Sequence, residues 1–213
     1  MKKIILLSAL ASAMLTSYAA HAAGNAVLKV TGSINPPSCS VEFAAGSTVS
    51  YDKIEGGTLK RTEPTALSAK ELPMQINCSQ NKQVAFTVVD NKADSRIPNL
   101  FGNTNGQNFG LGKQGERKIG GYRIVLKNNV IDETPNAKLI SRNGTSGPWG
   151  LAPESEVRQN TQLSFSGTGT EPASAKVFNT TLQVEARITK ADDLDMANEV
   201  VLDGMATISL VYI

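Results

Sequence analysis

The sequence predicts an all-β protein, and three observations lead to this prediction. Apolar and polar residues alternate with a period of two in one segment after another, as they do in half-buried strands. Short breaks rich in Gly, Pro, Asn and Ser separate these segments. Only the stretches TALSAKEL and ADDLDMANEV have the composition of a helical turn. The pattern as a whole is typical of an antiparallel sandwich or barrel.

The N-terminal segment has the pattern of a secretory signal peptide. Lys2 and Lys3 precede an apolar run over 4–15, and small residues surround a cleavage point after Ala22. A membrane anchor is the alternative, but it needs about 20 apolar residues and this run is shorter. We therefore expect residues 1–22 to be a signal peptide that is removed on export.

Removal of this leader leaves a mature chain with balanced charge and no histidine. The leader holds two of the 21 Lys and Arg residues and the single histidine, His21, so 19 basic residues remain beside 19 acidic ones. A nucleic-acid-binding protein needs a net basic surface, which a balanced chain does not provide. The loss of histidine excludes His-dependent catalytic triads and most zinc sites. We therefore predict no nucleic-acid partner, no catalytic residue, no metal site and no cofactor, and a protein that is not an enzyme.

An alternating segment follows the leader within residues 23–35. One of its apolar positions is a glycine, and the row reads Ala26, Leu28, Val30, Gly32 and Ile34. An Asn-Pro-Pro sequence then separates the segment from the next strand. A strand whose apolar row is interrupted by a glycine is better suited to fill the core of another protein than the core of its own domain. We predict a separate extension here.

Residues 36–213 are long enough for one domain with a substantial core. They contain two cysteines, Cys39 and Cys78, and an isolated pair in an exported protein most simply forms one disulfide. Closing a loop of this length would stabilise the fold by about 4 kcal/mol in the chain-entropy model. Free thiols at a catalytic site are the alternative, but the pair lacks the Cys-x-x-Cys spacing.

Several segments of this domain place their apolar side chains on one face and are expected to be strands. In chain order they are SCSVEF at 38–43, LPMQINC at 72–78, VAFTVVD at 84–90, GYRIVLK at 121–127, TQLSFSG at 161–167 and VFNTTLQVEARI at 177–188. The last alternating segment follows Gly204 and places four residues on one face: Ala206, Ile208, Leu210 and Tyr212. In an immunoglobulin-like topology a further strand would cover its free side, so we expect an open edge beside an uncovered core.

Two stretches of the domain lack regular alternation. Residues 90–121 and 132–160 are rich in Gly, Asn and Pro, and we expect long excursions of a kind that is often functional or mobile. Trp149 is predicted to pack on the sandwich as a lid rather than to serve as a ligand platform. A basic cluster and an acidic turn are predicted to be solvated: Lys113, Arg117, Lys118, Asp192, Asp193 and Asp195.

Taken in order, these motifs resemble the pilin subunits of the bacterial chaperone–usher (fimbrial) family. That family has an alternating extension with a glycine, then a first cysteine, here Cys39, and a second one, here Cys78. Its last strand follows a glycine and ends with a penultimate aromatic residue, here Tyr212. The two long irregular stretches indicate a minor or divergent member.

The resemblance implies an incomplete immunoglobulin-like β-sandwich that lacks its last strand and is completed by donor-strand complementation. The extension at 23–35 would be the donor strand, and 36–213 would be the pilin domain, with its two cysteines bridged. The donor residues would be Ala26, Leu28, Val30, Gly32 and Ile34. The acceptor groove and chaperone-binding last strand would comprise Gly204, Ala206, Ile208, Leu210, Tyr212 and Ile213.

The partners that the resemblance implies are a periplasmic pilus chaperone, an outer-membrane usher and other pilin subunits. The chaperone would lend a strand to the groove and hold the carboxylate of Ile213, and the extension of another subunit would replace it at the usher. The protein would pass through the periplasm to the cell surface as a structural subunit of a fimbria that supports adhesion. The alternative is a secreted β-sandwich module that binds carbohydrate or adheres without polymerisation, and such a module would have a complete fold.

Overall fold

The computed structural model describes residues 28–34, 38–102 and 106–213. The predicted signal peptide and Ala26 lie outside these residues. The chain divides into two units, Met1–Asn35 and Pro36–Ile213. In the first unit, the described residues 28–34 form neither strand nor helix, and all of their side chains are exposed. Within the part of the chain that the structure describes, no helix has the length and apolar character needed to cross a bilayer.

The second unit is all-β, which confirms the predicted class. Its strands are β1 (Cys39–Phe43), β2 (Thr65–Ala66), β3 (Lys70–Asp90), β4 (Phe109–Gly110), β5 (Lys113–Gln114), β6 (Arg117–Lys118), β7 (Gly120–Ile131), β8 (Thr134–Pro135), β9 (Lys138–Asn143), β10 (Gly150–Leu151), β11 (Thr161–Ser166), β12 (Ser174–Ile188) and β13 (Ala206–Tyr212). Short 3-10 turns lie at η1 (Gly56–Thr58), η2 (Ala93–Ser95), η3 (Pro153–Ser155) and η4 (Ala191–Asp193).

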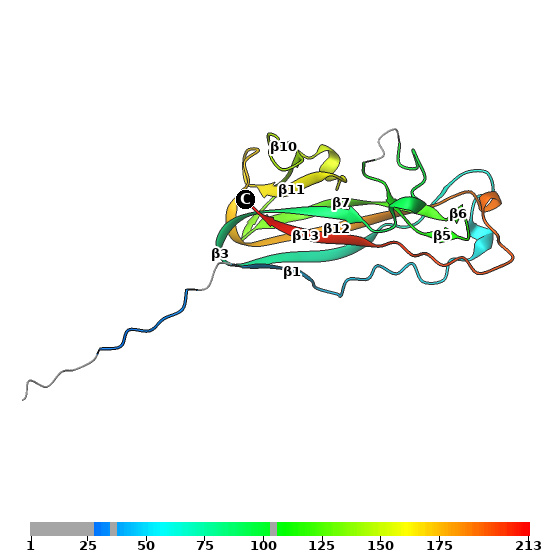
Figure 1. Ribbon diagram of the computed structural model, residues 1–213. Helices are drawn as coiled ribbons and strands as arrows, with labels where there is room; N and C mark the ends of the chain where they lie inside the picture. The colour runs from blue at the N-terminus through cyan, green and yellow to red at the C-terminus, as the bar shows by residue number, and fades with distance from the viewer. Residues whose placement is uncertain (1–27, 35–37, 103–105) are drawn as a thin grey trace, which may run out of the picture. The chain divides into compact units, whose positions relative to one another are not determined.

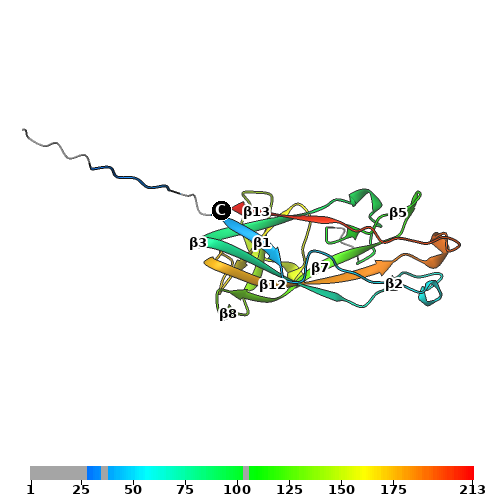
Figure 2. The same ribbon diagram turned by 90° about the horizontal axis from the view of Figure 1, so that it is seen from below.

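One long strand, β3, belongs to both halves of a curled sheet (Figures 1 and 2). The N-terminal half of β3 pairs antiparallel with β1 and with β12, which continues through β7 to β4. We call this half the first limb. The C-terminal half of β3 pairs antiparallel with β13 and with β11, which continues through β9 to β10. We call this half the second limb. Strands β1 and β13 therefore both flank β3, one in each limb.

The hydrophobic core lies between the two limbs, as in a β-sandwich. Phe178 of the first limb and Phe86 and Phe165 of the second are almost fully buried. The centroid of the Phe165 ring lies 5.8 Å from the ring centroid of Phe86 and 5.8 Å from the ring centroid of Phe178. This aromatic stack joins the limbs because alternation along each strand directs these side chains inward. The predicted apolar faces are thus confirmed as core-facing.

The structure differs from the predicted strand boundaries at β3. LPMQINC and VAFTVVD were expected as separate strands, but they are the two halves of one continuous strand, Lys70–Asp90. The intervening Ser79–Gln83 sequence is polar and mostly exposed because the strand passes there from one limb to the other. Of the two expected helical turns, ADDLDMANEV contains η4, whereas TALSAKEL contains β2 and the start of β3.

The two irregular stretches contain more regular structure than expected. Strands β4, β5 and β6 lie within 90–121, and β8, β9 and β10 lie within 132–160. Most of these strands are only two residues long, which is too short to leave an alternating pattern. Trp149 is half-buried, and its ring lies 4.5 Å from the guanidinium carbon of Arg142. It therefore packs against a side chain of β9.

The basic and acidic clusters are divided among separate partners. Lys113 pairs with Asp94 at 2.9 Å, and the Arg117 guanidinium donates to the Asp193 carbonyl at 3.2 Å. Asp192 pairs with Arg61 at 3.0 Å. These contacts tie neighbouring loops together. Among the described residues, no group of three His, Cys, Asp or Glu side chains is placed to hold a metal ion.

Candidate functional site

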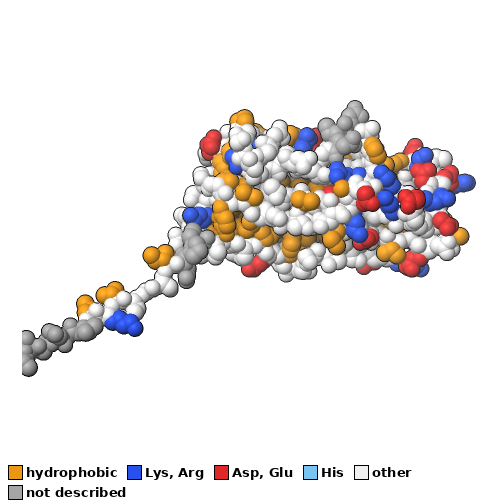
Figure 3. Space-filling view, in the orientation of Figure 1, with side chains coloured by type: hydrophobic (Ala, Val, Ile, Leu, Met, Phe, Trp, Pro, Cys, Tyr) orange, Lys and Arg blue, Asp and Glu red, His pale blue; other side chains and the backbone are white. Residues whose placement is uncertain are grey.

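An apolar groove of about 1270 Å³ runs between the free edges of the two limbs. Its first wall is β1 and the segment 47–56, and its second wall is the segment 198–205 and the start of β13. The floor is formed by side chains of β3, β7 and β12, among them Leu72, Ile124 and Val184. Figure 3 shows hydrophobic side chains gathered along this face of the molecule. The groove is therefore bordered by two stretches of chain that are far apart in the sequence.

The edge of β1 directs half of its backbone groups towards the groove. The Ala44 amide donates to the Pro73 carbonyl at 3.2 Å, and the Ser79 amide donates to the Ser38 carbonyl at 2.9 Å. Backbone groups in an antiparallel strand alternate between its two edges. The even-numbered residues thus bond to β3, and the backbone groups of Cys39, Val41 and Phe43 point to the open edge.

Strand β13 presents its other edge in the same way. The Asn91 amide donates to the Met205 carbonyl at 2.9 Å, which places the odd-numbered residues in hydrogen-bonded pairs with β3. The backbone groups of Ala206, Ile208, Leu210 and Tyr212 therefore point away from β3. Within the described residues, β13 pairs with β3 alone, and so does β1. The groove thus lies between two strand edges that can each accept a further strand.

The side chains along both walls are only half-buried, in contrast to the core. They pack against the core and are Val41, Phe43, Val49, Tyr51 and Leu59 on one side and Val200, Leu202, Ala206, Ile208 and Leu210 on the other. Each wall thus has a row of apolar side chains that face the core, and among the described residues no further layer covers these rows. A half-buried apolar surface of this kind is typical of an interaction site or a ligand-binding groove.

The floor of the groove lies close to the chain at Gly204. A Cβ atom added there would lie 2.9 Å from Cε1 of Tyr122 and 3.0 Å from Cδ2 of Leu111. The contact with Tyr122 is shorter than real Cβ atoms show and the contact with Leu111 is tight, so a larger residue at this position would force these side chains to move. Burial of the Tyr122 side chain, together with the negative charge of Asp90, raises the pKa of the phenol well above its usual range.

The raised pKa of Tyr122 predicts alkaline destabilisation. The unfolded chain releases this proton from about pH 10, whereas the folded chain keeps it, so the free energy of unfolding falls as pH rises above that point. We expect Tyr122→Phe to show a shallower fall between about pH 10 and 12 than the wild type, because phenylalanine has no proton to lose. Urea unfolding across this range measures the slopes. Equal slopes for the two proteins would contradict the prediction.

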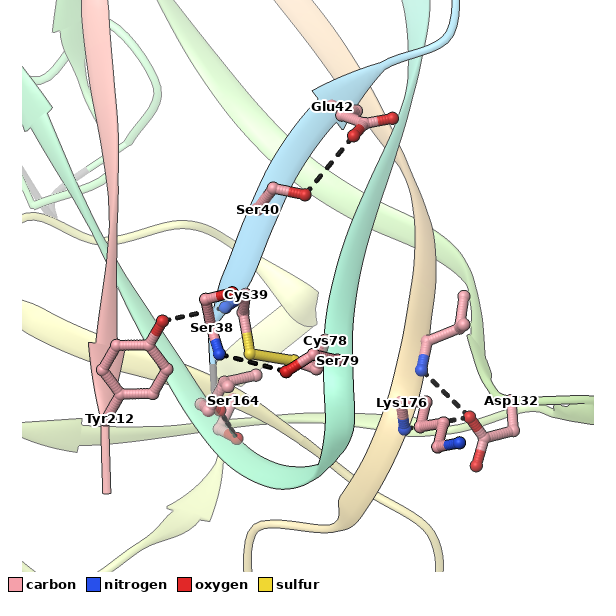
Figure 4. Close-up of a disulfide and its surroundings, with 12 residues drawn as sticks. Ser38, Cys39, Ser40, Glu42, Cys78, Ser79, Asp132, Ser164, Lys176 and Tyr212 are labelled. Carbon is pink, nitrogen blue, oxygen red and sulfur yellow. Dashed lines mark hydrogen bonds between the residues drawn. A yellow bond between two sulfur atoms is a disulfide. The ribbon is translucent and has the colours of Figure 1, made fainter. Parts of the chain in front are cut away.

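One end of the groove is closed by a contact between its two walls. The Cys39 amide donates to the Tyr212 hydroxyl at 2.8 Å (Figure 4). Cys39 also forms the predicted disulfide with Cys78, the residue directly opposite it in β3, and the free-thiol alternative is thereby excluded. The Ser38 amide next to the bridge donates to Oγ of Ser79 at 3.2 Å.

The other end of the groove narrows between η1 and the segment that follows η4. A Cβ atom on Gly56 would lie 2.7 Å from Cε of Met196, so the two segments are in close contact there. Nearby, the Tyr51 hydroxyl donates to the Val184 carbonyl at 3.1 Å and ties the first wall to β12. Lys92 and Asp203 form an ion pair that holds the second wall beside β3.

The predicted acceptor residues occupy different parts of this site. Gly204, Ala206 and Ile208 line the groove, whereas Leu210 is half-buried against the core. Tyr212 is 54% exposed, and its hydroxyl bonds across the closed end. Ile213 is 39% exposed beyond that contact. Most of the wall residues were not predicted from the sequence. They are Val49, Tyr51, Leu59, Val200 and Leu202.

The predicted donor residues that the structure describes are fully accessible. Leu28, Val30 and Ile34 are 87%, 85% and 99% exposed. A Cβ atom on Gly32 would have no heavy atom within 4 Å. Nothing in the described part of the extension therefore restrains these side chains or explains the glycine within its own unit.

Comparison with known proteins gives two similarities. Residues 28–123 match a family described as "Protein of unknown function (DUF1120)", and this match covers less than half of the chain. The chain is also 23% identical over 224 residues to "Uncharacterized protein YhcF" of Escherichia coli (strain K12). That similarity covers 91% of this chain and 93% of the relative. The family match begins at Leu28, so it includes the described extension together with β1 and β3.

Proposed function

We propose that this protein is a structural subunit of a surface fimbria, assembled by donor-strand exchange. The observation that carries the proposal is the apolar groove between β1 and β13, whose two borders are open strand edges. In this proposal the domain is an immunoglobulin-like sandwich without its last strand, and the groove is the place of that strand. The extension of another copy of the chain fills it.

The dimensions of the two parts support this proposal. Strand β13 has seven residues and spans about 23 Å at roughly 3.3 Å per residue. The described extension, 28–34, has the same number of residues and the same alternation. An added strand of this length can bond to the outward-pointing backbone groups of β13 along its full course. Its alternate side chains then enter the apolar groove, which gives register as well as affinity.

The energetics also support complementation by another copy. Three aliphatic side chains of the extension, Leu28, Val30 and Ile34, are almost fully exposed. Burying them is worth roughly 5–9 kcal/mol before ordering costs are subtracted. The half-buried side chains of both walls are covered by the same event, so the assembled form is expected to dissociate very slowly. Complementation itself drives the assembly.

The exported subunit requires partners that protect the groove before assembly. An open edge beside apolar side chains is an aggregation hazard. We propose that a periplasmic chaperone lends a strand to this groove and that an outer-membrane usher exchanges it for the extension of the next subunit. The fimbria then forms at the cell surface and supports adhesion. The family match at 28–123 includes the described extension and the first part of the domain.

Polymerisation of the purified mature chain tests the proposed function. We expect the wild-type chain to form SDS-resistant oligomers, and a variant with Leu28, Val30 and Ile34 changed to serine to remain monomeric. A matched control changes Lys29, Thr31 and Ser33 to alanine, because these side chains point to the opposite face of an extended strand.

Gel electrophoresis without boiling and mass photometry read out this comparison. The control variant is expected to polymerise like the wild type. A wild-type chain that stays a stable, soluble monomer without any chaperone would contradict the fimbrial proposal and favour a self-contained binding module. Equal loss of oligomers in both variants would contradict the assignment of the apolar row as the inserted face.

A further inference from the structure

Tyr212 bridges the two walls of the groove at its disulfide end. Its hydroxyl accepts a hydrogen bond from the Cys39 amide at 2.8 Å (Figure 4). Among the described residues, this is the one hydrogen bond between β1 and β13. Tyr212 shares a face of β13 with Ala206, Ile208 and Leu210, but it lies past the core, so the residue remains 54% exposed. The residue therefore fastens one open edge to the other.

The β1 side of this contact is held rigidly. Cys39 is fixed to β3 by the disulfide to Cys78 and by its place in the antiparallel ladder. The neighbouring Ser38 bonds to Ser79 through both its amide and its carbonyl. Among the described residues, the Tyr212 hydroxyl has the Cys39 amide as its one hydrogen-bond partner, and no covalent link holds the side chain in place. Opening of this end therefore requires movement of Tyr212 and not of Cys39.

The Cys39 amide is one of the groups that an added strand needs. Its N–H points away from β3, like the backbone groups of Val41 and Phe43, so it belongs to the open edge of β1. A strand that pairs with the whole of β1 must bond to that N–H, and in the free chain the Tyr212 hydroxyl already occupies it. Two acceptors compete for one donor.

We propose that Tyr212 is a releasable clasp that closes the disulfide end of the groove until a strand displaces it. This inference rests on the proposed function, because it assumes that the groove receives a strand. The clasp is suited to release because an exposed neutral hydrogen bond contributes only about 1 kcal/mol net. It joins the walls in the empty subunit, and its hydroxyl turns to solvent when the incoming carbonyl takes over the Cys39 amide.

Two measurements on the full mature chain test the clasp. Both use a chain in which Leu28, Val30 and Ile34 are changed to serine, so that it stays monomeric with an empty groove, and the wild type in these comparisons means this reference chain. The first is hydrogen exchange of the Cys39 amide, compared between the wild type and Tyr212→Phe. The second is the association rate of a fluorescent peptide with the sequence of residues 26–36, AVLKVTGSINP. Tyr51→Phe is the matched control, because it removes a hydroxyl that bonds the first wall to Val184 but does not cross the groove.

We expect Tyr212→Phe to raise both rates by about fivefold, the factor that corresponds to a net hydrogen bond of about 1 kcal/mol. Tyr51→Phe is expected to leave both rates at the wild-type level. Unchanged exchange at Cys39 in Tyr212→Phe overturns the clasp, whatever the peptide does. Faster exchange with an unchanged peptide rate overturns its role in strand entry.

The same design separates the clasp from the proposed function. A peptide that binds neither the wild type nor Tyr212→Phe contradicts donor-strand uptake, and the exchange measurement alone then decides whether the two walls are fastened. Slower peptide association in Tyr212→Phe also overturns the proposal, because the hydroxyl would then assist the incoming strand rather than compete with it.

Discussion

Gly32→Phe is expected to slow polymerisation strongly while the domain remains as stable as the wild type. In the proposed assembly Gly32 occupies an inward position of the inserted strand, between Val30 and Ile34. A large side chain there meets the groove floor, and overpacking of this kind costs about 1–3 kcal/mol. That cost alone slows assembly by roughly 5- to 150-fold. Within its own unit the substitution is free of contacts, because nothing lies within 4 Å of the Cβ position.

Ser33→Phe is the matched control for this prediction. It adds the same side chain one residue further along, where it points to the outer face of the inserted strand. We expect Ser33→Phe to assemble at close to the wild-type rate and Gly32→Phe to assemble roughly 5- to 150-fold more slowly, as followed by unboiled gel electrophoresis. Thermal unfolding of the monomers checks that the domain is unaffected. Normal assembly of Gly32→Phe, or equal failure of both variants, would remove the assignment of Gly32 to the groove.

Much of the fold could be predicted from the sequence, because the alternation of apolar and polar residues indicates that one face of a strand is buried. The inward rows of β7, β11 and β12 were evident from this pattern, and the only two cysteines of the chain made their pairing evident. The continuity of β3 could not be predicted, because its polar bend at 79–83 has the composition of a loop between two strands. A bend at which a strand changes limb has the composition of a turn.

The groove could be predicted only in part from the sequence, for a related reason. The row on β13 is strictly alternating and was evident. Tyr51 and Leu202 lie in segments without regular secondary structure, so their inward direction depends on tertiary contacts. The bond from Cys39 to Tyr212 joins residues 173 positions apart, and only the folded chain brings them together. The assembly itself stays a prediction, since it depends on a second chain.

Removal of the disulfide is expected to cost the domain about 4 kcal/mol of unfolding free energy. The bridge closes a separation of 39 residues, and the chain-entropy model gives about this value for such a loop. We expect Cys39→Ser combined with Cys78→Ser to lower the urea midpoint accordingly, and a reducing agent to have the same effect on the wild type. Ser79→Ala is the control: it removes the neighbouring hydrogen bond from Ser38 but keeps the bridge, so its loss is expected to be about 1 kcal/mol.

Removal of the disulfide is expected to destabilise β1 first, and with it one wall of the groove. Strand β1 has five residues and is paired on one side only, so the bridge is what holds its first residue to β3. Without it, hydrogen exchange in β1 should become much faster while exchange in β12, which is paired on both sides, changes only with global stability. Peptide uptake should weaken too, because one wall of the groove has frayed. Equal protection of β1 with and without the bridge would show that packing against the core, rather than the covalent link, maintains that wall.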